Sequence, residues 1–342
     1  MSLKNLSVKI KIPKLLQKKL DNKRIIKIYT EFEKSLNLNK DFVVAVSGGP
    51  DSLALSFLAK IYSIRKKLNA RFVIVDHKLR PESTKEAKHV QKILKEFFIK
   101  SEILTWKGKK SFKNIQSLAR NKRFELLFSF CNKFKIQNVL LGHHQDDLFE
   151  NFFIRLLRGS GLKGLISLDK EAEINDKILL RPLLKYKKED LIFISKHVFN
   201  YYVQDPTNND IKYQRTKIRK LIEELRENGL DKIKFLKTIN NLKNSNKVVN
   251  FYVSENLDRN TYFSIKKKQL ILNKNFFQQP YEVVFRAFSD ALKMVGKKYY
   301  SVRGKKIDKV INDINNNQSF RSTLGGCLIE KVSKTVIISK ES

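Results

Sequence analysis

Short apolar runs alternate with longer amphipathic stretches through the first two thirds of the chain. The first run, Phe42–Val46, is rich in the branched residues of a buried parallel strand. Similar runs follow at 72–75, 102–104, 138–142 and 181–184, and helical spacing of apolar residues occupies 53–67, 82–98, 114–134 and 187–200. Strands that alternate with helices predict an α/β fold with a doubly wound parallel sheet.

The pattern changes after about residue 220. Residues 220–245 are charged and helical, 249–275 predict strands or a mixed region, and 281–315 predict helices. Two closing runs, Thr323–Ile329 and Lys334–Ser339, predict a β-hairpin. We therefore expect two domains: 1–220, with a helical lead-in over 14–38, and a smaller, mostly helical α+β domain over 221–342.

Composition narrows the class of protein. Lys and Arg number 70 against 34 Asp and Glu, a formal net charge of +36 that favours a polyanionic partner such as nucleic acid over a merely solvated basic surface. Cys131 and Cys327 lie far apart, which argues against a disulfide framework and a cysteine-ligated metal site. The sequence shows neither a membrane span nor a signal peptide, so we expect a cytoplasmic protein with no membrane partner.

A glycine loop separates the first strand from the helix that follows it. Its residues are Ser47, Gly48, Gly49, Pro50, Asp51 and Ser52. Backbone amides and a helix N-terminus in such a turn bind phosphate. Asp51 would repel phosphate unless a cation lies between them, which favours a magnesium-bound polyphosphate. The alternative is a glycine turn that merely caps a helix.

Further polar clusters follow the other strands, and the carboxyl ends of parallel strands meet at one edge of a sheet. Asp76 and His77 follow the second strand, and His143 and His144 the fourth. Arg120 and Arg123 share one helical face, as do Asp147 and Glu150. Two facing carboxylates suit Mg²⁺ or an ammonium group. Zinc is an alternative, although two adjacent histidines are not a usual spacing for zinc ligands. A further alternative is that the acids only stabilise the helix dipole at the N-terminus of the helix.

Two later segments are basic. Arg155 and Arg158 precede a glycine-rich turn, and Arg215 and Arg219 follow the turn-forming segment 205–210. Both segments suit contact with a nucleic-acid backbone. A plain helix C-cap and a plain turn with a helix cap are the alternatives.

The Ser-Gly-Gly-X-Asp-Ser loop resembles the PP-loop of the ATP pyrophosphatase superfamily, which has the adenine nucleotide alpha hydrolase-like fold. Seven segments in this order resemble a tRNA(Ile)-lysidine synthetase, and the resemblance is dense over roughly residues 40–220. They are 47–52, 76–83, 119–123, 142–150, 158–164, 181–184 and 205–219.

The resemblance implies a ligase that adenylates the C2 oxygen of the wobble cytidine in the CAU anticodon of tRNA(Ile), releasing pyrophosphate. Free L-lysine then displaces AMP to give lysidine, and codon recognition changes from AUG to AUA. ATP and Mg²⁺ are the implied cofactors.

The resemblance also implies roles for particular residues. The implied catalytic residues are Asp51, Arg123, Asp147 and Glu150, with Asp51 also placing the metal. The implied ATP-binding residues are Ser47, Gly48, Gly49, Pro50, Asp51, Ser52, Asp76, His77 and His143. The implied tRNA-binding residues are Arg120, Arg155, Arg158, Arg215 and Arg219.

Other functions remain open at this point. One alternative is a tRNA thiolase of the same superfamily, and another is a catalytically silent RNA-binding protein. By analogy with the family, we expect the second domain to contact tRNA and expect the further C-terminal domain of longer members to be absent. A homodimer is compatible with the sequence but not specified by it.

Overall fold

The protein is described by a computed structural model covering residues 12–107, 115–204, 214–297 and 302–341, with the backbone alone at 115–117. The chain divides into two compact units, 1–229 and 230–342. The boundary expected after residue 220 falls inside a helix, α9 (Gln214–Glu227), which lies wholly within the first unit.

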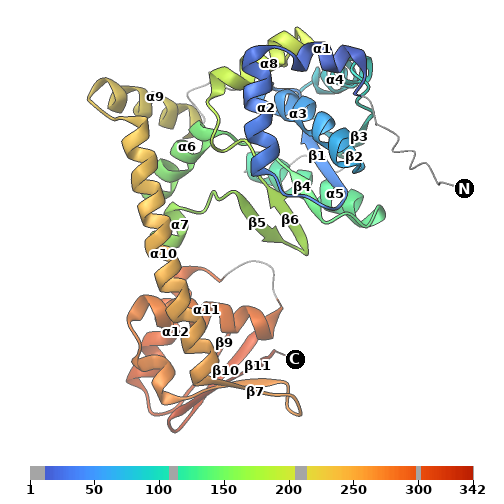
Figure 1. Cartoon of the computed structure of the whole chain (residues 1–342). Helices are drawn as coiled ribbons and strands as arrows, with labels where there is room; N and C mark the ends of the chain where they lie inside the picture. Colours follow the sequence, from blue (N-terminus) through green and yellow to red (C-terminus); the bar gives the residue numbers. More distant parts are fainter. Residues whose placement is uncertain (1–11, 108–114, 205–213, 298–301, 342) are drawn as a thin grey trace, which may run out of the picture. The chain divides into compact units, whose positions relative to one another are not determined.

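The first unit is built on a six-stranded sheet in the order β3-β2-β1-β4-β6-β5 (Figure 1). Its strands are β1 (Phe42–Val46), β2 (Ala70–Asp76), β3 (Ser101–Thr105), β4 (Asn138–Leu140), β5 (Glu171–Ile174) and β6 (Lys177–Leu180). Neighbouring strands run parallel except for β5 and β6. The strand order switches between β1 and β4, and in such sheets ligands bind beyond the carboxyl ends at the switch.

Helices cover both faces of this sheet. Along β1, Phe42 and Val44 belong to the core on one face, whereas Val43 belongs to the core on the other. The first face is covered by α1 (Lys14–Leu20), α2 (Lys23–Ser35), α3 (Pro50–Lys66), α4 (Ser83–Glu96) and α8 (Lys188–Phe199), and the second by α5 (Ile115–Lys133). Burial on both faces explains the continuous apolar runs of the strands. The predicted doubly wound sheet is confirmed.

Three more helices, α6 (Gln145–Leu156), α7 (Leu162–Leu165) and α9, complete this unit, and α6 packs against α9. One expected strand is wrong. Residues 181–184 form a turn, because the strand of this region ends at Leu180 and pairs with β5 in a hairpin. Asn175 and Asp176 both have positive φ at its tip, as a two-residue hairpin turn requires. The half-exposed, acidic β5 lacks an apolar run, so hydrophobicity did not reveal it.

The second unit packs helices onto an antiparallel sheet in the order β7-β8-β11-β10-β9. Its strands are β7 (Thr261–Ser264), β8 (Gln269–Leu272), β9 (Phe320–Leu324), β10 (Cys327–Val332) and β11 (Thr335–Lys340). Its helices are α10 (Lys232–Asn260), the short 3-10 helix η2 (Lys274–Gln278), α11 (Tyr281–Gly296) and α12 (Gly304–Asn316). The predicted smaller α+β architecture of the C-terminal region is confirmed.

Two details of this unit differ from expectation. α10 continues through residues 249–260, where strands or a mixed region were expected. The expected hairpin exists as β10 and β11, but its first strand was placed across the turn at Gly325 and Gly326 that separates β9 from β10. Both glycines have positive φ, which marks a turn rather than a strand.

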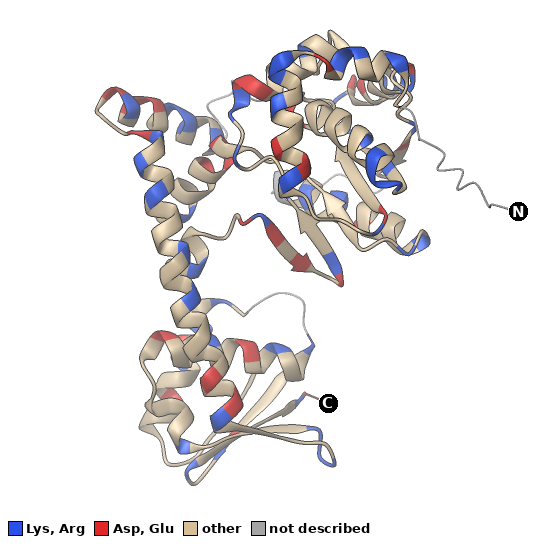
Figure 2. Ribbon diagram, in the orientation of Figure 1, with Lys and Arg blue, Asp and Glu red and all other residues tan. Residues whose placement is uncertain are grey.

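Among the described residues, no helix combines the length and the apolar character that crossing a membrane requires. Lys and Arg are distributed over elements of both units (Figure 2). The basic charge by itself therefore does not single out one binding surface.

Candidate active site

The glycine loop, Ser47–Ser52, connects the carboxyl end of β1 to the first turn of α3. The Ser52 hydroxyl is buried, accepts hydrogen bonds from the Ser47 amide and hydroxyl at 3.1 Å each, and donates to the Gly49 carbonyl at 3.0 Å. Pro50 takes the first helical position, where no amide is needed. Ser47 remains exposed. The loop is thus closed on itself, and the positive end of α3 faces the space beyond the sheet.

Gly48 fixes how this loop is held. Its φ is +83°, and a Cβ there would lie 2.8 Å from Val90 Cγ2 on α4 and 2.9 Å from Val203 Cγ2. The Val203 amide also donates a hydrogen bond to the Gly48 carbonyl at 2.9 Å. The segment after α8 therefore packs against the glycine loop and is hydrogen-bonded to it. Any residue other than glycine at position 48 would be strained.

Helix α6 begins beside the start of α3. Gly142 follows β4, and a Cβ there would lie 3.2 Å from backbone atoms of Asp51 and Ser52. This close approach brings the start of α6 against the start of α3. Two positive helix ends therefore meet at the switch between β1 and β4, where an anionic ligand is favoured.

His144 joins the acidic residues of the two helix starts. Its Nδ1 accepts a hydrogen bond from the Asp146 amide at 3.2 Å, while the Asp147 carboxylate accepts one from the His144 amide at 2.9 Å. These bonds cap α6 and assign the neutral ring its proton on Nε2. Nε2 lies 3.7 Å from carboxylate oxygens of both Asp51 and Asp147. The imidazole therefore holds the two acids apart.

Asp51 has the surroundings of a cation ligand. Its Oδ1 is buried without a hydrogen-bond partner. Burial raises the pKa of Asp51, and Asp147 raises it further, whereas His144 and Lys188 lower it. A bound cation would satisfy the orphaned oxygen. Within the described residues no group of three or more metal-ligating side chains exists, and the buried, unpartnered carboxylate oxygen of Asp51 is compatible with a magnesium ligand.

Glu150 lies one turn further along α6 and is also buried. Its Oε1 accepts a hydrogen bond from Nε of Arg219 on α9 at 2.5 Å, and its Oε2 is buried with no partner. Burial lowers the pKa of Arg219, but Glu150, Asp147 and Asp51 together raise it above its ordinary value. The expected phosphate-binding Arg219 thus pairs with the expected catalytic Glu150, and one carboxylate oxygen remains open.

Several arginines lie close enough to lower one another's pKa. Burial and then the charges of Arg215 and Arg155 lower the pKa of Arg120. Burial, Arg120 and Arg215 lower the pKa of Arg123 to about 10, which leaves it cationic at neutral pH, and its Nε is buried without a partner. We call Arg120, Arg123, Arg155 and Arg215 the arginine cluster. Mutual repulsion of this kind is relieved by a bound polyanion.

Two histidines lie beside the arginine cluster. Burial lowers the pKa of His143 to about 3, opposed by Asp147 and reinforced by Arg181, Arg123 and Arg120. Burial and Arg123 lower the pKa of His77. Both rings have a buried Nδ1 without a partner and can therefore meet a ligand as neutral groups.

Two expected site residues are engaged elsewhere. Asp76 accepts hydrogen bonds from the Lys78 amide at 2.9 Å, the Ser83 hydroxyl at 2.9 Å and the Thr84 hydroxyl at 2.6 Å. It therefore fastens the start of α4. Arg158 is exposed, and its Nη2 donates to Gln214 at 2.8 Å, which links α6 to α9. Residues 205–210, expected beside the site, lie outside the described residues.

Sequence reasoning gave no role to His144 or Arg181. His144 precedes two acids at a helix start, and this capping position was the signal that could have found it. Arg181 is buried after β6, and its Nη1 donates to the Asp169 carbonyl at 2.7 Å. Its place in the site could not be read from the sequence because it depends on the unpredicted β5–β6 hairpin.

Comparisons with known proteins identify the family. Residues 18–225 match the PP-loop domain family. A tRNA(Ile)-lysidine synthase of Wolbachia pipientis wMel is 32% identical over 313 residues, covering 89% of this chain and 71% of that one. Its counterpart in Orientia tsutsugamushi (strain Boryong) is 31% identical over 318 residues, covering 89% and 70%.

A solved structure shares the fold. It is a U34-tRNA thiolase from Methanococcus maripaludis with a [4Fe-4S] cluster, and it matches with a TM-score of 0.55 at 18% identity, covering 64% of this chain and 78% of that one. At this identity the likeness concerns the fold alone. Together with the family match and the curated relatives, the observations on the site establish that the chain belongs to the tRNA(Ile)-lysidine synthase family of PP-loop proteins.

Proposed function

We propose that the protein ligates L-lysine to C2 of the wobble cytidine in the CAU anticodon of tRNA(Ile), in two steps driven by ATP. The single observation that carries the proposal is the meeting of two opposite environments at the switch between β1 and β4. Asp51, Asp147 and Glu150 form an acidic group around Arg219, the arginine cluster forms a basic group, and His143 is affected by charges of both. A reaction that joins a cationic amine to a polyanionic RNA through ATP needs both.

The first step uses the glycine loop. The C2 oxygen of the cytidine attacks the α-phosphorus of ATP, the bond from that phosphorus to the α,β-bridging oxygen breaks, and pyrophosphate leaves. The amides at the start of α3 and the Ser47 hydroxyl hold the departing phosphates. Arg123, cationic and with a donor left unpaired, neutralises the charge that develops on the α-phosphate. Neutral His77 and His143 supply hydrogen bonds beside it.

Asp51 would hold the magnesium ion, as its orphaned buried oxygen supports. When bound, the ion supplies charge neutralisation between the phosphates and the carboxylates around them. His144 keeps Asp51 and Asp147 apart so that each carboxylate serves its own partner.

The second step uses α6. The ε-amine of lysine attacks C2 of the adenylated cytidine, the bond from C2 to the AMP oxygen breaks, and AMP leaves. The open Oε2 of Glu150 accepts the lysine ammonium, while Arg219 fixes the carboxylate through Oε1. Asp147 takes the proton that the amine must lose before it attacks.

The arginine cluster holds the RNA near these groups. The target cytosine must leave its base stack, at a cost of a few kcal/mol that phosphate contacts offset. Arg158 and the second unit are proposed to extend this tRNA contact. We propose that the reaction takes place in the cytoplasm, where the tRNA is used, and homodimerisation stays a prediction.

Two other functions are less well supported. A thiolase that used an iron–sulfur cluster would need several cysteine ligands, and the sequence has two, which lie in different compact units. A silent RNA-binding protein would not need carboxylates facing a phosphate site.

Pyrophosphate release separates the enzyme from the silent binding protein. The protein is incubated with ATP, Mg²⁺ and tRNA(Ile) bearing the CAU anticodon, without lysine. The proposal predicts pyrophosphate in amounts up to one per enzyme-bound tRNA and depending on the tRNA. A binding protein would release none.

A further inference from the structure

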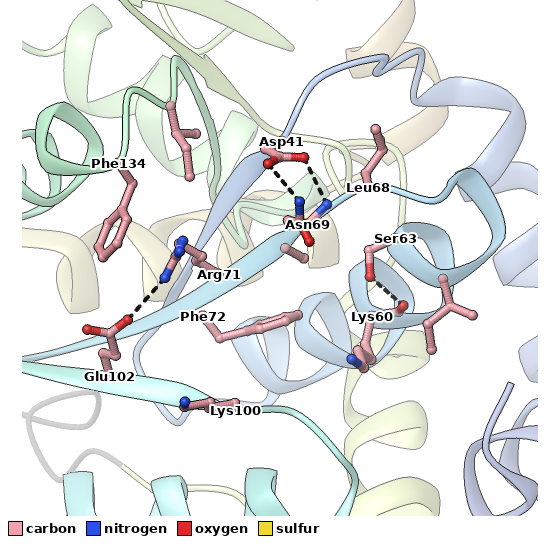
Figure 3. A pocket seen from close by; sticks show the side chains of 13 residues that line it. Asp41, Lys60, Ser63, Leu68, Asn69, Arg71, Phe72, Lys100, Glu102 and Phe134 are labelled. Carbon is pink, nitrogen blue, oxygen red and sulfur yellow. Dashed lines mark hydrogen bonds and ion pairs between the residues drawn. The ribbon is translucent and has the colours of Figure 1, made fainter. Parts of the chain in front are cut away.

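A cavity of about 380 Å³ lies at the edge of the sheet opposite to the glycine loop. It is formed where β1 and β2 begin, by the second half of α3, the start of β3 and the residues after α5. Figure 3 shows its lining from close by. We call it the amino-edge pocket. The proposed reaction uses the carboxyl ends of the same strands, so this pocket has no part in it.

Three of the charged residues around the pocket, Asp41, Arg71 and Glu102, have partners among the lining residues. Both Asp41 carboxylate oxygens accept hydrogen bonds from Asn69, one from its backbone amide at 2.9 Å and the other from its side chain at 3.0 Å. Arg71 pairs with Glu102 at 3.6 Å, and its guanidinium lies 3.6 Å from the centroid of the Phe134 ring. These contacts form two walls of the pocket, and both Asp41 and Arg71 already have partners within the protein.

Two lysines are different. Lys60, on α3, and the exposed Lys100, just before β3, both line the pocket (Figure 3). No hydrogen bond or ion pair engages either ammonium group within the described part of the chain. Burial lowers the pKa of Lys60, because its charge is partly removed from water without a compensating carboxylate. An anion bound in the pocket would stabilise the charged form of Lys60.

The remaining lining is mixed: Ser63 and Asn69 are polar, and the other residues are apolar. Ile64 and Leu68 come from the end of α3 and the loop after it, and Phe72 comes from β2. The volume falls in the range of about 300–1,000 Å³ that small-molecule sites occupy. Apolar walls with a few placed charges are the usual construction of such sites.

We propose that the amino-edge pocket binds a small aromatic anion, with its phosphate or carboxylate group held by Lys60 and Lys100 and its ring packed against Ile64, Leu68 and Phe72. Such a ligand would contact the far end of the helix whose first turn belongs to the glycine loop. The site is separate from that of ATP.

Pyridoxal 5′-phosphate is a suitable probe, because its aldehyde condenses with an unprotonated lysine amine to an imine and water. The intact protein is treated briefly with the probe and then with borohydride, and labelled lysines are identified by peptide mass spectrometry. Lys60 is expected to react faster than exposed Lys95, since a lowered pKa leaves more of its amine unprotonated.

Protection by phenyl phosphate tests the site itself. Saturating phenyl phosphate should slow labelling of Lys60 about fivefold and leave Lys95 unchanged, whereas inorganic phosphate at the same concentration should protect less. Lys100→Met should weaken the protection, and the charge-matched Lys95→Met should not. Magnesium-ATP should give no protection.

Three outcomes would overturn the proposal: equal labelling of Lys60 and Lys95, equal protection of both by phenyl phosphate, or protection that Lys100→Met leaves unchanged. Protection of Lys60 by ATP would equally contradict a separate site. Release of pyrophosphate in the presence of tRNA is unaffected by any of these results, so the proposed function is judged independently.

Discussion

At the scale of the residue, Asp51 combines a role in ligand binding with an unfavourable environment. It is partly buried, one oxygen has no partner, and Asp147 lies nearby. These features raise its pKa, so the ionised form is disfavoured by folding. A carboxylate there does not stabilise the fold, and the proposed binding of a cation-bound polyphosphate would give it a function.

Replacement of Asp51 separates function from stability. Asp51→Asn should reduce tRNA-dependent pyrophosphate release about a hundredfold or more, because the polyphosphate loses its anchor. It should not lower the melting temperature at pH 7. The folded-state pKa of Asp51 is raised, so its contribution to stability is present at low pH and lost as the pH rises through that pKa.

The stability gain of Asp51→Asn at pH 7 should therefore shrink as the pH falls toward about 4. Melting curves at several pH values check this, with the exposed Asp176→Asn as a charge-matched control. Unchanged pyrophosphate release in Asp51→Asn would refute the metal-bridging role.

Glu150→Gln should affect the second step alone. The amide cannot bind the lysine ammonium as a charge, so lysine incorporation should fall about tenfold to a hundredfold while adenylation of tRNA persists. The two steps are followed separately, by labelled AMP on tRNA and by labelled lysine. The exposed Glu125→Gln, on α5, makes the same change in charge away from the site. Equal loss of both steps would assign Glu150 to the first.

Individual roles were only partly predictable from the sequence. The glycine loop and the Asp147–Glu150 face could be read from local spacing, because both lie within one turn or one helix. The pairing of Glu150 with Arg219 could not, since it depends on α9 packing against α6. Asp76 looked like a ligand contact at a strand end, but its oxygens are taken by the start of α4.

At the scale of the element, the glycine loop depends on its neighbours. Gly48→Ala should destabilise the protein by about 2–4 kcal/mol, combining positive-φ strain with overpacking against Val90 and Val203. It should also abolish ATP use, because the amides move. Gly159→Ala is the matched control: its φ is also positive, at +65°, but a Cβ there has no neighbour within 4 Å.

Denaturant unfolding of both glycine variants measures the difference. If Gly48→Ala costs no more than Gly159→Ala, the clamp by α4 and the Val203 segment does not hold the loop. If Gly48→Ala lowers the free energy of unfolding more than Gly159→Ala but releases pyrophosphate normally, ATP use tolerates the movement of the loop amides.

Elements were predictable where apolar runs were strong. The central parallel strands and the helices between them follow from burial on both faces, which leaves a continuous apolar signal. β5, with only half-exposed and exposed positions, carried no such signal, and α10 ran through residues whose composition is mixed. Turn glycines, as at 325 and 326, were the better guide to strand ends.

At the scale of the whole molecule, the charge of +36 is spread over both units, so only part of it can touch tRNA. The charges of Arg155 and Arg215 lower the pKa of Arg120, whereas Arg219 forms an ion pair with Glu150. We therefore propose that the arginine cluster, rather than Arg219, makes most of the phosphate contacts.

The salt dependence of tRNA binding should reflect this assignment. Each phosphate neutralised contributes about 0.7–0.9 to the slope of log K against log salt, so Arg155→Gln with Arg215→Gln should flatten it by roughly 1.5. Arg24→Gln with Arg65→Gln, whose partners are Asp190 and Glu33, should leave it unchanged. Filter binding across a salt series measures both. Equal slopes would move tRNA docking to another surface.

Incorporation of labelled lysine into RNA tests the central claim most directly. The protein is incubated with ATP, Mg²⁺ and labelled lysine, and separately with tRNA(Ile) and tRNA(Met), which share the CAU anticodon. The account predicts label in tRNA(Ile) only, in amounts that depend on ATP, and none when the wobble cytidine is replaced. Release of pyrophosphate from ATP in the presence of tRNA(Ile), without any incorporation of lysine, would contradict it.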